Sequence, residues 1–251
     1  QLKSEAEEFD RLVTVFNGML ERLEKSFHQA TRFSADAAHE LKTPLTILQG
    51  ELERGIQHAE TGSVEQERYG RLLEEVQRVK SITRKLLLLS MADAGKLRVK
   101  RRDVDFTQMV EDVCEDIEVL APHLRLEKTL QKKVHIAADP DLIRQIVQNL
   151  ANNAVKYNQP KGHIGVYLRQ KNGEVKLTVA NTGGTIPEEE RERIFERFYR
   201  IEKSRNRASA GVGLGLSLAR EIARAHGGEL LLDAPKDKQV TAFTLRLPAG
   251  E

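Results

Sequence analysis

Apolar residues return every three or four positions from about residue 9 to residue 59, with hardly an interruption. This spacing gathers them on one side of a helix and predicts that the stretch is helical almost throughout. The pattern then breaks at Gly62, a residue suited to a helix stop, and Ser63 is the expected N-cap of a second helix, with Gln66 three residues later. The second helix has an apolar face of its own and ends near Gly95.

Two long helices joined by a short loop predict a helical hairpin. The first helix presents Leu41, Leu45, Leu48, Leu52 and Ile56 on one face, and the second helix contains four consecutive leucines, residues 86–89. A hairpin cannot bury so wide an apolar face alone, so we expect it to pair with a second copy as a four-helix bundle. A coiled-coil scaffold without chemistry is the alternative interpretation of this half.

The residue pattern changes from Asp103 onward and predicts alternating short helices and strands. The expected helices are 106–121, 140–158, 188–200 and 215–228, and the expected strands are 133–139, 163–170, 174–181 and 239–248, with a turn at 171–173. Strands on one side and helices on the other predict a two-layer α/β sandwich.

Composition excludes several classes of protein. Forty Lys and Arg against 38 Asp and Glu leave a net charge of +2, which argues against a dedicated nucleic-acid binder. The basic run at 96–102 is interpreted as a solvated linker strand rather than a nucleic-acid or lipid patch. The single cysteine, Cys114, is interpreted as a small core residue, which suits a reducing cytoplasm. No apolar run approaches the ~20 residues of a membrane span, and the chain begins in mid-helix without methionine, so this absence describes the fragment only.

His39 differs from an ordinary helical histidine in its neighbours. It lies away from the apolar face, and Glu40 directly after it can keep one ring nitrogen protonated, which leaves the other nitrogen free as a nucleophile. Thr43 follows one turn later on the same face, and Pro44 is expected to kink or loosen the helix. The other six histidines are interpreted as surface residues.

A second polar group lies in the helix expected at 140–158. Asn149, Asn153 and Lys156 are spaced to share one helix face. They are either an ordinary solvated surface or a site for a metal-bridged phosphate, because Mg²⁺ takes few protein ligands and completes its shell with water and phosphate oxygens.

The glycine-rich run at 211–216, GVGLGL, directly precedes another expected helix. Glycines at a helix N-terminus let backbone N–H groups approach an anion, although alone this signal is weak. The chain has no phosphate loop, dinucleotide fingerprint or protein-kinase signature, so ATP would have to bind in another kind of fold.

These motifs together resemble those of bacterial sensor histidine kinases. Residues 33–48, FSADAAHELKTPLTIL, resemble the phosphoacceptor box of that family, and NLANNAVKY at 149–157 resembles its asparagine box. RIFERFYR at 193–200 and GVGLGL at 211–216 resemble its phenylalanine box and second glycine box. Residues 9–27 are similar to the last helix of a HAMP signal relay, which follows a transmembrane helix in full-length members.

The resemblance implies an α plus α/β architecture, in which a hairpin forming a dimeric four-helix bundle precedes a two-layer sandwich of the histidine kinase, gyrase and chaperone type. The implied domains are the end of a HAMP helix at 1–27, the dimerisation and phosphotransfer hairpin at 28–95, a linker at 96–104 and the catalytic ATP-binding domain at 105–251. It also implies the cytoplasmic domain of a bacterial inner-membrane protein, which meets the membrane only through a missing N-terminal part.

The same resemblance implies residue roles. His39 would take the γ-phosphoryl group of ATP, Glu40 would act as its acid/base, and Thr43 would place a water when phosphate is removed from the partner. Asn153 would hold Mg²⁺, and residues 201–210 would form a mobile lid. The implied nucleotide-binding residues are Asn149, Asn153, Lys156, Tyr157, Asn181, Gly183, Ile186, Tyr199, Arg200, Gly211, Gly213, Leu214, Gly215, Leu216 and Thr241.

One motif departs from the family pattern. The first glycine box usually opens with an aspartate that accepts a hydrogen bond from the adenine amino group, and here Asn181 stands in its place. Thr185 occupies the position of the second glycine, whereas Thr241 matches the threonine that supports the aspartate. We therefore expect weaker ATP binding than in aspartate-bearing relatives, with Asn181→Asp restoring affinity.

The implied function is a homodimeric, ATP-dependent kinase that autophosphorylates His39, passes the phosphoryl group to an aspartate of a response regulator receiver domain, and acts as the regulator's phosphatase. One alternative is a degraded kinase that binds nucleotide poorly and acts as a phosphatase or scaffold. Another is a non-kinase member of the same ATPase superfamily, such as a chaperone or topoisomerase domain, against which the HELKTP motif argues.

Overall fold

The structure is a computed structural model that describes residues 40–201, 212–233 and 239–250. The chain divides into two compact units, Gln1–Lys96 and Leu97–Glu251. We call them the hairpin unit and, after the activity expected from its motifs, the ATPase unit. In the portions described, no helix is both long and apolar enough to cross a membrane.

The described part of the hairpin unit is a helix over residues 40–58 and helix α2 (Val64–Asp93). The predicted loop chemistry is confirmed at the start of α2. Gly62 has a φ of +79°, and the Ser63 side chain accepts a hydrogen bond from the Gln66 N–H at 3.1 Å. The Gln66 side chain accepts in turn from the Gly62 N–H at 2.9 Å, so side-chain hydrogen bonds join the loop to the first turn of α2.

Polar and aromatic contacts hold the two helices together. The Lys80 ammonium donates to the Gln49 side-chain oxygen at 2.9 Å. Tyr69 packs its ring over Gly55, where a Cβ atom would lie 3.0 Å from the ring. The hairpin is therefore fixed by contacts near its loop and its middle.

Much of the predicted apolar face of the hairpin stays exposed. Leu45 is buried, but Leu48 is 50% exposed and Leu72 is 46% exposed, with Leu41 and Val79 close to these values. A single copy of the hairpin thus leaves large aliphatic side chains in water, as the sequence predicts.

The ATPase unit is built on a five-stranded sheet with the order β2-β4-β5-β7-β6, in which β2 is parallel to β4 and the other neighbours are antiparallel. The strands are β2 (Arg125–Leu130), β4 (His163–Lys171), β5 (Glu174–Thr182), β6 (Glu229–Leu232) and β7 (Val240–Pro248). A second, two-stranded sheet pairs β1 (Arg102–Asp105) antiparallel with β3 (His135–Ala138).

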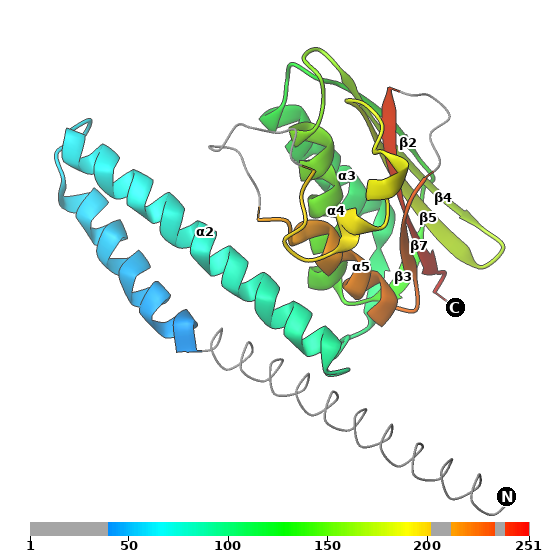
Figure 1. Cartoon of the computed structure of the whole chain (residues 1–251), viewed down its shortest axis with the longest axis horizontal. Helices are drawn as coiled ribbons and strands as arrows, with labels where there is room; N and C mark the ends of the chain where they lie inside the picture. Colours follow the sequence, from blue (N-terminus) through cyan, green and yellow to red (C-terminus); the bar gives the residue numbers. More distant parts are fainter. Residues whose placement is uncertain (1–39, 202–211, 234–238, 251) are drawn as a thin grey trace, which may run out of the picture. The chain divides into compact units, whose positions relative to one another are not determined.

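Three helices cover one face of the large sheet (Figure 1): α3 (Phe106–Leu120), α4 (Pro140–Lys156) and α5 (Gly215–Ala225). The core between the layers is closed by side chains that are almost fully buried, including Phe106, Ile143, Ile146, Leu150, Ile164, Leu177, Leu218, Ile222 and Leu245. The two-layer α/β sandwich predicted from the sequence is therefore confirmed.

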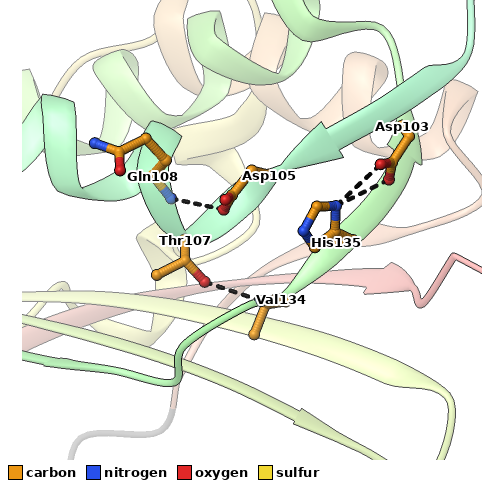
Figure 2. A network of polar contacts seen from close by, with 6 residues as sticks. All are labelled: Asp103, Asp105, Thr107, Gln108, Val134 and His135. Atoms are coloured by element: carbon orange, nitrogen blue, oxygen red, sulfur yellow. Dashed lines mark hydrogen bonds and ion pairs between the residues drawn. The ribbon is translucent and has the colours of Figure 1, made fainter.

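A polar network fixes the start of α3 against the small sheet (Figure 2). Asp105 is the N-cap of α3, and the Thr107 hydroxyl accepts from the Val134 N–H at 3.0 Å. The His135 ring contacts both carboxylate oxygens of Asp103 across β1 and β3 at 3.1 Å. These contacts join β1 and α3 firmly to the start of β3.

Within the described residues, each predicted element is present except one. The helix expected at 188–200 is wrong, because this segment forms only two single 3₁₀ turns, η1 (Glu188–Glu190) and η2 (Arg193–Phe195). A helix cannot continue through Phe198, whose φ is +61°. Three strands, β1, β2 and β6, were not predicted, because they are short or carry several charges.

Candidate active site

Helix α4 carries the first group of predicted site residues. Pro140 occupies its first turn and Asp139 caps it, which fixes where the helix starts. Its apolar face is buried in the core, so Asn149, Asn153 and Lys156 lie on the partly exposed side. Part of the predicted shared face is thus confirmed as accessible.

Asn149 connects α4 to the glycine-rich run. Its side-chain NH₂ donates to the Gly215 carbonyl oxygen at 3.3 Å, at the first residue of α5. Leu214 precedes this helix and is buried, and Leu216 follows in its first turn. The structure therefore brings the asparagine box and the second glycine box into direct contact.

Gly213 is required where the chain enters this turn. Its φ is +77°, and a Cβ atom there would lie 2.7 Å from the Tyr199 carbonyl oxygen and 2.8 Å from the Phe198 carbonyl carbon. The Phe198 N–H donates to the Gly213 carbonyl oxygen at 2.9 Å. The residues on either side of the predicted lid are thus held side by side, while Gly211 and lid residues 202–210 lie outside the described part of the chain.

The end of β5 meets the end of α4. A Cβ atom at Gly183 would lie 2.0 Å from the Tyr157 carbonyl oxygen, so only glycine fits there. Tyr157 is the C-cap of α4, and the Lys156 ammonium lies 5.1 Å from the centre of its ring. Because of this close approach, Asn181 and Tyr157 become neighbours.

Asn181 is only 5% exposed, and its neighbours fix how its amide lies. The NH₂ group donates to the Tyr157 carbonyl oxygen at 3.3 Å and to the Thr182 carbonyl oxygen at 3.4 Å. Turning the amide over would place its oxygen against these two carbonyls, which disfavours that orientation. The side-chain oxygen accepts no hydrogen bond from another described residue and is left available to a donor.

Thr241 lies directly opposite Asn181 on β7, as expected, but its hydroxyl donates to the Gly184 carbonyl oxygen at 2.6 Å. Beside it, an open pocket is lined by Thr185, Ile186, Arg191, Leu232, Asp233, Val240 and Thr241. Two predicted nucleotide-binding residues, Ile186 and Thr241, thus line the same pocket as residues that were not predicted.

Tyr199 and Arg200 are partly buried after η2. The Tyr199 hydroxyl donates to a carboxylate oxygen of Glu190, and the Arg193 guanidinium lies 4.3 Å from the centre of the Tyr199 ring. These contacts tie Tyr199 to the two 3₁₀ turns, and within the described residues its side chain makes no hydrogen bond to α4 or α5.

In the hairpin unit the described helix begins at Glu40, and His39 lies outside the described residues. Glu40, Thr43 and Pro44 are exposed, and the helix runs through Pro44 without a break. The Thr46 hydroxyl donates to the Lys42 carbonyl oxygen at 2.8 Å, a contact that often bends helices. A weakened backbone around Pro44 is therefore retained as a prediction.

Two side chains outside this group differ in how well they were predicted. Cys114 is buried as expected, and burial raises the pKa of its thiol to about 11, so it is not a nucleophile at neutral pH. His226 is 2% exposed, so its interpretation as a surface residue is wrong. The ring lies at the C-cap of α5, against the Ile222 carbonyl oxygen one turn earlier, and accepts from the N–H of Asp139, the N-cap of α4, which lies 87 residues away in the sequence.

The fit of a divalent cation can be examined from the donors present. The described residues contain no group of three or more His, Cys, Asp or Glu side chains that could hold a metal ion. The half-buried Asn153 side chain makes no hydrogen bond to another described residue, and its amide oxygen is a suitable single ligand for Mg²⁺. A metal that takes most of its ligands from phosphate and water fits this donor set.

Comparison with known families agrees with this geometry. Residues 29–95 match the His Kinase A phosphoacceptor domain, and residues 138–251 match the family of histidine kinase-, DNA gyrase B- and HSP90-like ATPases. The phosphoacceptor match excludes the chaperone and topoisomerase alternative.

Among similar proteins, the signal transduction histidine-protein kinase ArlS of Staphylococcus aureus is 33% identical over 244 residues, which is 96% of this chain and 54% of ArlS. The chain therefore spans about half the length of the curated relatives it matches. The mycobacterial sensor histidine kinase MprB is 30% identical, with a TM-score of 0.54, and the match covers 59% of this chain and 98% of that one.

The fold is also that of histidine kinase ThkA in its complex with the response regulator TrrA, with a TM-score of 0.56 at 22% identity over 87% of this chain and 61% of that one. Because both domain models match in the expected order and the ArlS alignment covers almost the whole chain, the chain belongs to the two-component sensor histidine kinases.

Proposed function

We propose that this chain is the cytoplasmic kinase portion of a bacterial inner-membrane sensor. It would use ATP and Mg²⁺ to phosphorylate His39 and pass the phosphoryl group to an aspartate of a response regulator. The observation that carries this proposal is the hydrogen bond from Asn149 to Gly215, which joins the amide-bearing face of α4 to the glycine-rich start of α5. The HELKTP motif belongs to the other unit, the hairpin. The chain would therefore hold both an ATP site, the phosphoryl donor, and a histidine acceptor.

The phosphate end of the nucleotide would lie between α4 and α5. Asn153 would offer its amide oxygen to Mg²⁺, and Lys156 adds a positive charge one turn later. When bound, the cation neutralises the phosphate charge that builds up during transfer. Backbone N–H groups at the start of α5 would donate to phosphate oxygens. Among the described residues, no side chain caps this helix, and its first turn contains no acidic residue.

The base would lie at the other end of the site, against Tyr157, Ile186 and Asn181. The side-chain oxygen of Asn181 would accept a hydrogen bond from the amino group of adenine. Because the Asn181 NH₂ group is held by two backbone carbonyls, the oxygen needs no reorientation on binding.

In the transfer step a ring nitrogen of His39 attacks the γ-phosphorus of ATP. A P–N bond forms as the bond to the bridging oxygen breaks, and ADP leaves with that oxygen. Glu40 would hold the proton on the other ring nitrogen, and the exposed Thr43 hydroxyl would later place a water on the regulator's phosphoryl group.

The working form would be a homodimer through the hairpin, since Leu48 and Leu72 stay about half exposed in one copy. Domain limits of 1–27, 28–95, 96–104 and 105–251 fit this arrangement.

A second candidate is a kinase that binds nucleotide weakly and works mainly as a phosphatase or scaffold. Asn181 favours it, because an amide oxygen accepts a weaker hydrogen bond than a carboxylate.

Labelled ATP tests the main proposal. With Mg²⁺ the chain should gain an acid-labile, base-stable phosphoryl group. His39→Gln should abolish the label, whereas the variant His58→Gln should retain it, because His58 is an exposed histidine of the described helix at 40–58. Asn153→Ala should remove most of it and the exposed neighbour variant Asn152→Ala should not. Label that persists in His39→Gln would defeat the assignment.

A further inference from the structure

The segment that leads into the ATPase unit is anchored to α4. The Lys100 backbone N–H donates to one carboxylate oxygen of Asp139 at 3.1 Å. The other carboxylate oxygen caps α4 by accepting from the N–H groups of Asp141 and Leu142 at 3.2 and 3.3 Å. One carboxylate therefore holds both the incoming chain and the N-terminus of the helix that bears Asn149 and Asn153.

Asp139 is also bound to the end of α5. Its backbone N–H donates to Nε2 of His226 at 3.0 Å, and Nδ1 of the same ring lies 2.8 Å from the Ile222 carbonyl oxygen. An acceptor at Nε2 and an oxygen beside Nδ1 fix the ring as the neutral tautomer with its proton on Nδ1. His226 thus works as an acceptor for α4 and a donor to its own helix.

Helices α4 and α5 are consequently tied at two places. Asp139 meets His226 where α4 begins and α5 ends, and Asn149 meets Gly215 at the start of α5. Breaking the Asp139–His226 hydrogen bond would change how the two helices lie against each other. Because the helices are stiff and closely packed, a shift at one end also moves the other end. The second tie belongs to the proposed phosphate site.

We propose that Asp139 and His226 are positioning residues through which the segment entering the ATPase unit sets the geometry of the nucleotide site. The inference rests on the proposed function, since it assumes that α4 and α5 hold the nucleotide. It requires no contact between the two units, because the chain that ends α2 at Asp93 continues directly to Lys100. A movement of that chain at Lys100 would act on Asp139 through their hydrogen bond.

Lys100 allows the tie to be cut without touching the site. Lys100→Pro removes the N–H that Asp139 accepts, whereas Lys100→Ala removes the exposed side chain and keeps the N–H. We expect Lys100→Pro to weaken ADP binding by about fivefold or more, a typical coupling between sites, and Lys100→Ala to bind as the unchanged chain does. Equal affinities in the two variants would overturn the proposal.

Asp139→Asn gives a second route if Lys100→Pro does not fold. Asparagine caps helices about as well as aspartate, but its NH₂ group cannot accept from Lys100 when its oxygen faces the helix. This variant should also lose ADP affinity at an unchanged unfolding temperature. Unchanged affinity would count against the role of the tie.

His226 provides a readout that a purely structural role would not change. Burial lowers its pKa below the ordinary value for histidine, and the charged groups that act on the ring are Arg101, before β1, and Asp139. Protonation would turn Nε2 into a donor facing the Asp139 N–H, so ADP affinity should fall as the pH drops below about 6.5 and through the lowered pKa. His226→Gln keeps an acceptor that does not titrate, so it should retain affinity and lose this part of the pH profile. His226→Phe should bind weakly at every pH.

These measurements use titration calorimetry on the whole chain and separate two kinds of failure. If the unchanged chain binds no ADP at all, the proposed function fails. If it binds ADP but His226→Gln and His226→Phe bind equally well, with the same pH profile as the unchanged chain, the nucleotide site stands and the positioning role is wrong.

Discussion

The ATPase unit closes its core within one chain, whereas the hairpin unit leaves a large share of its apolar face in water. Ile143, Ile146 and Leu218 have no exposed surface, while Leu48 and Leu72 are about half exposed. The proposed donor site is therefore assembled by a unit that is complete in itself. The proposed acceptor, His39, belongs to a unit whose leucines would be buried in the proposed homodimer.

Glycines show the same contrast at the level of single atoms. Around Gly183 and Gly213 the backbone of another segment occupies the space of a side chain, whereas nothing lies within 4 Å of the Cβ position of Gly50 or Gly70 in the hairpin. Both of these tight backbone contacts lie at the proposed nucleotide site. The two units should thus respond in opposite ways to the same substitution.

Gly183→Ala should have the largest effect. The added methyl group would lie 2.0 Å from the Tyr157 carbonyl oxygen, so either α4 or the end of β5 must move. We expect the ATPase unit to lose about 2–3 kcal/mol of unfolding free energy and the chain to lose measurable ADP binding. Thermal unfolding and ADP titration check this, with Gly70→Ala as the matched control; an unchanged affinity would show that the close approach is not needed.

Asn181→Asp should have a moderate effect, and the structure reverses its expected sign. The residue pattern alone predicts tighter nucleotide binding, because a carboxylate is the stronger acceptor. In the structure, however, a buried carboxylate would face the carbonyl oxygens of Tyr157 and Thr182, which now accept from the amide. Leaving buried groups unsatisfied costs about 1–3 kcal/mol, more than the ~1 kcal/mol a better acceptor gains.

We therefore expect Asn181→Asp to weaken ADP binding by roughly three- to tenfold near neutral pH. Its carboxyl would have a raised pKa, so affinity should recover as the pH falls and the group is protonated. Calorimetry over a pH series, run beside the unchanged chain, measures this. Tighter binding at every pH would restore the simpler expectation from the sequence.

Gly50→Ala should have the smallest effect and the opposite sign. Glycine inside a helix costs about 1 kcal/mol relative to alanine, and the described structure offers no contact that the methyl group would disturb. The hairpin should gain about 0.5–1 kcal/mol, measured as a higher unfolding temperature. A loss of stability instead would indicate that a second copy packs against this position.

Local signals predicted those elements whose ends are fixed by neighbouring residues. Asp139 and Pro140 mark the start of α4, and the turn between β4 and β5 follows from Asn172 and Gly173, whose φ angles of 52° and 75° suit a tight hairpin. Two of the motifs, the asparagine box and the second glycine box, likewise led to residues that the structure brings together, Asn149 and Gly215.

Features that depend on distant partners were not predictable. The segment at 188–200 has the composition of a helix, but Phe198 is drawn out of the helical conformation by its contact with Gly213. The buried ring of His226 accepts from the N–H of Asp139, the N-cap of α4 and 87 residues away. Arg191 lines a pocket together with the ends of β6 and β7. The amide orientation at Asn181 depends on a carbonyl 24 residues away.

The edges of the large sheet bear on how copies of the chain meet one another. Each edge strand presents unpaired N–H and C=O groups, to which a strand of a neighbouring molecule could add. At one edge β2 carries Arg125, Glu127 and Lys128 within six residues, and at the other β6 is only four residues long. Charged or short edges resist such strand addition and the aggregation that follows from it. The edges thus disfavour sheet-to-sheet joining of crowded molecules, and the proposed self-association would use the leucines of the hairpin.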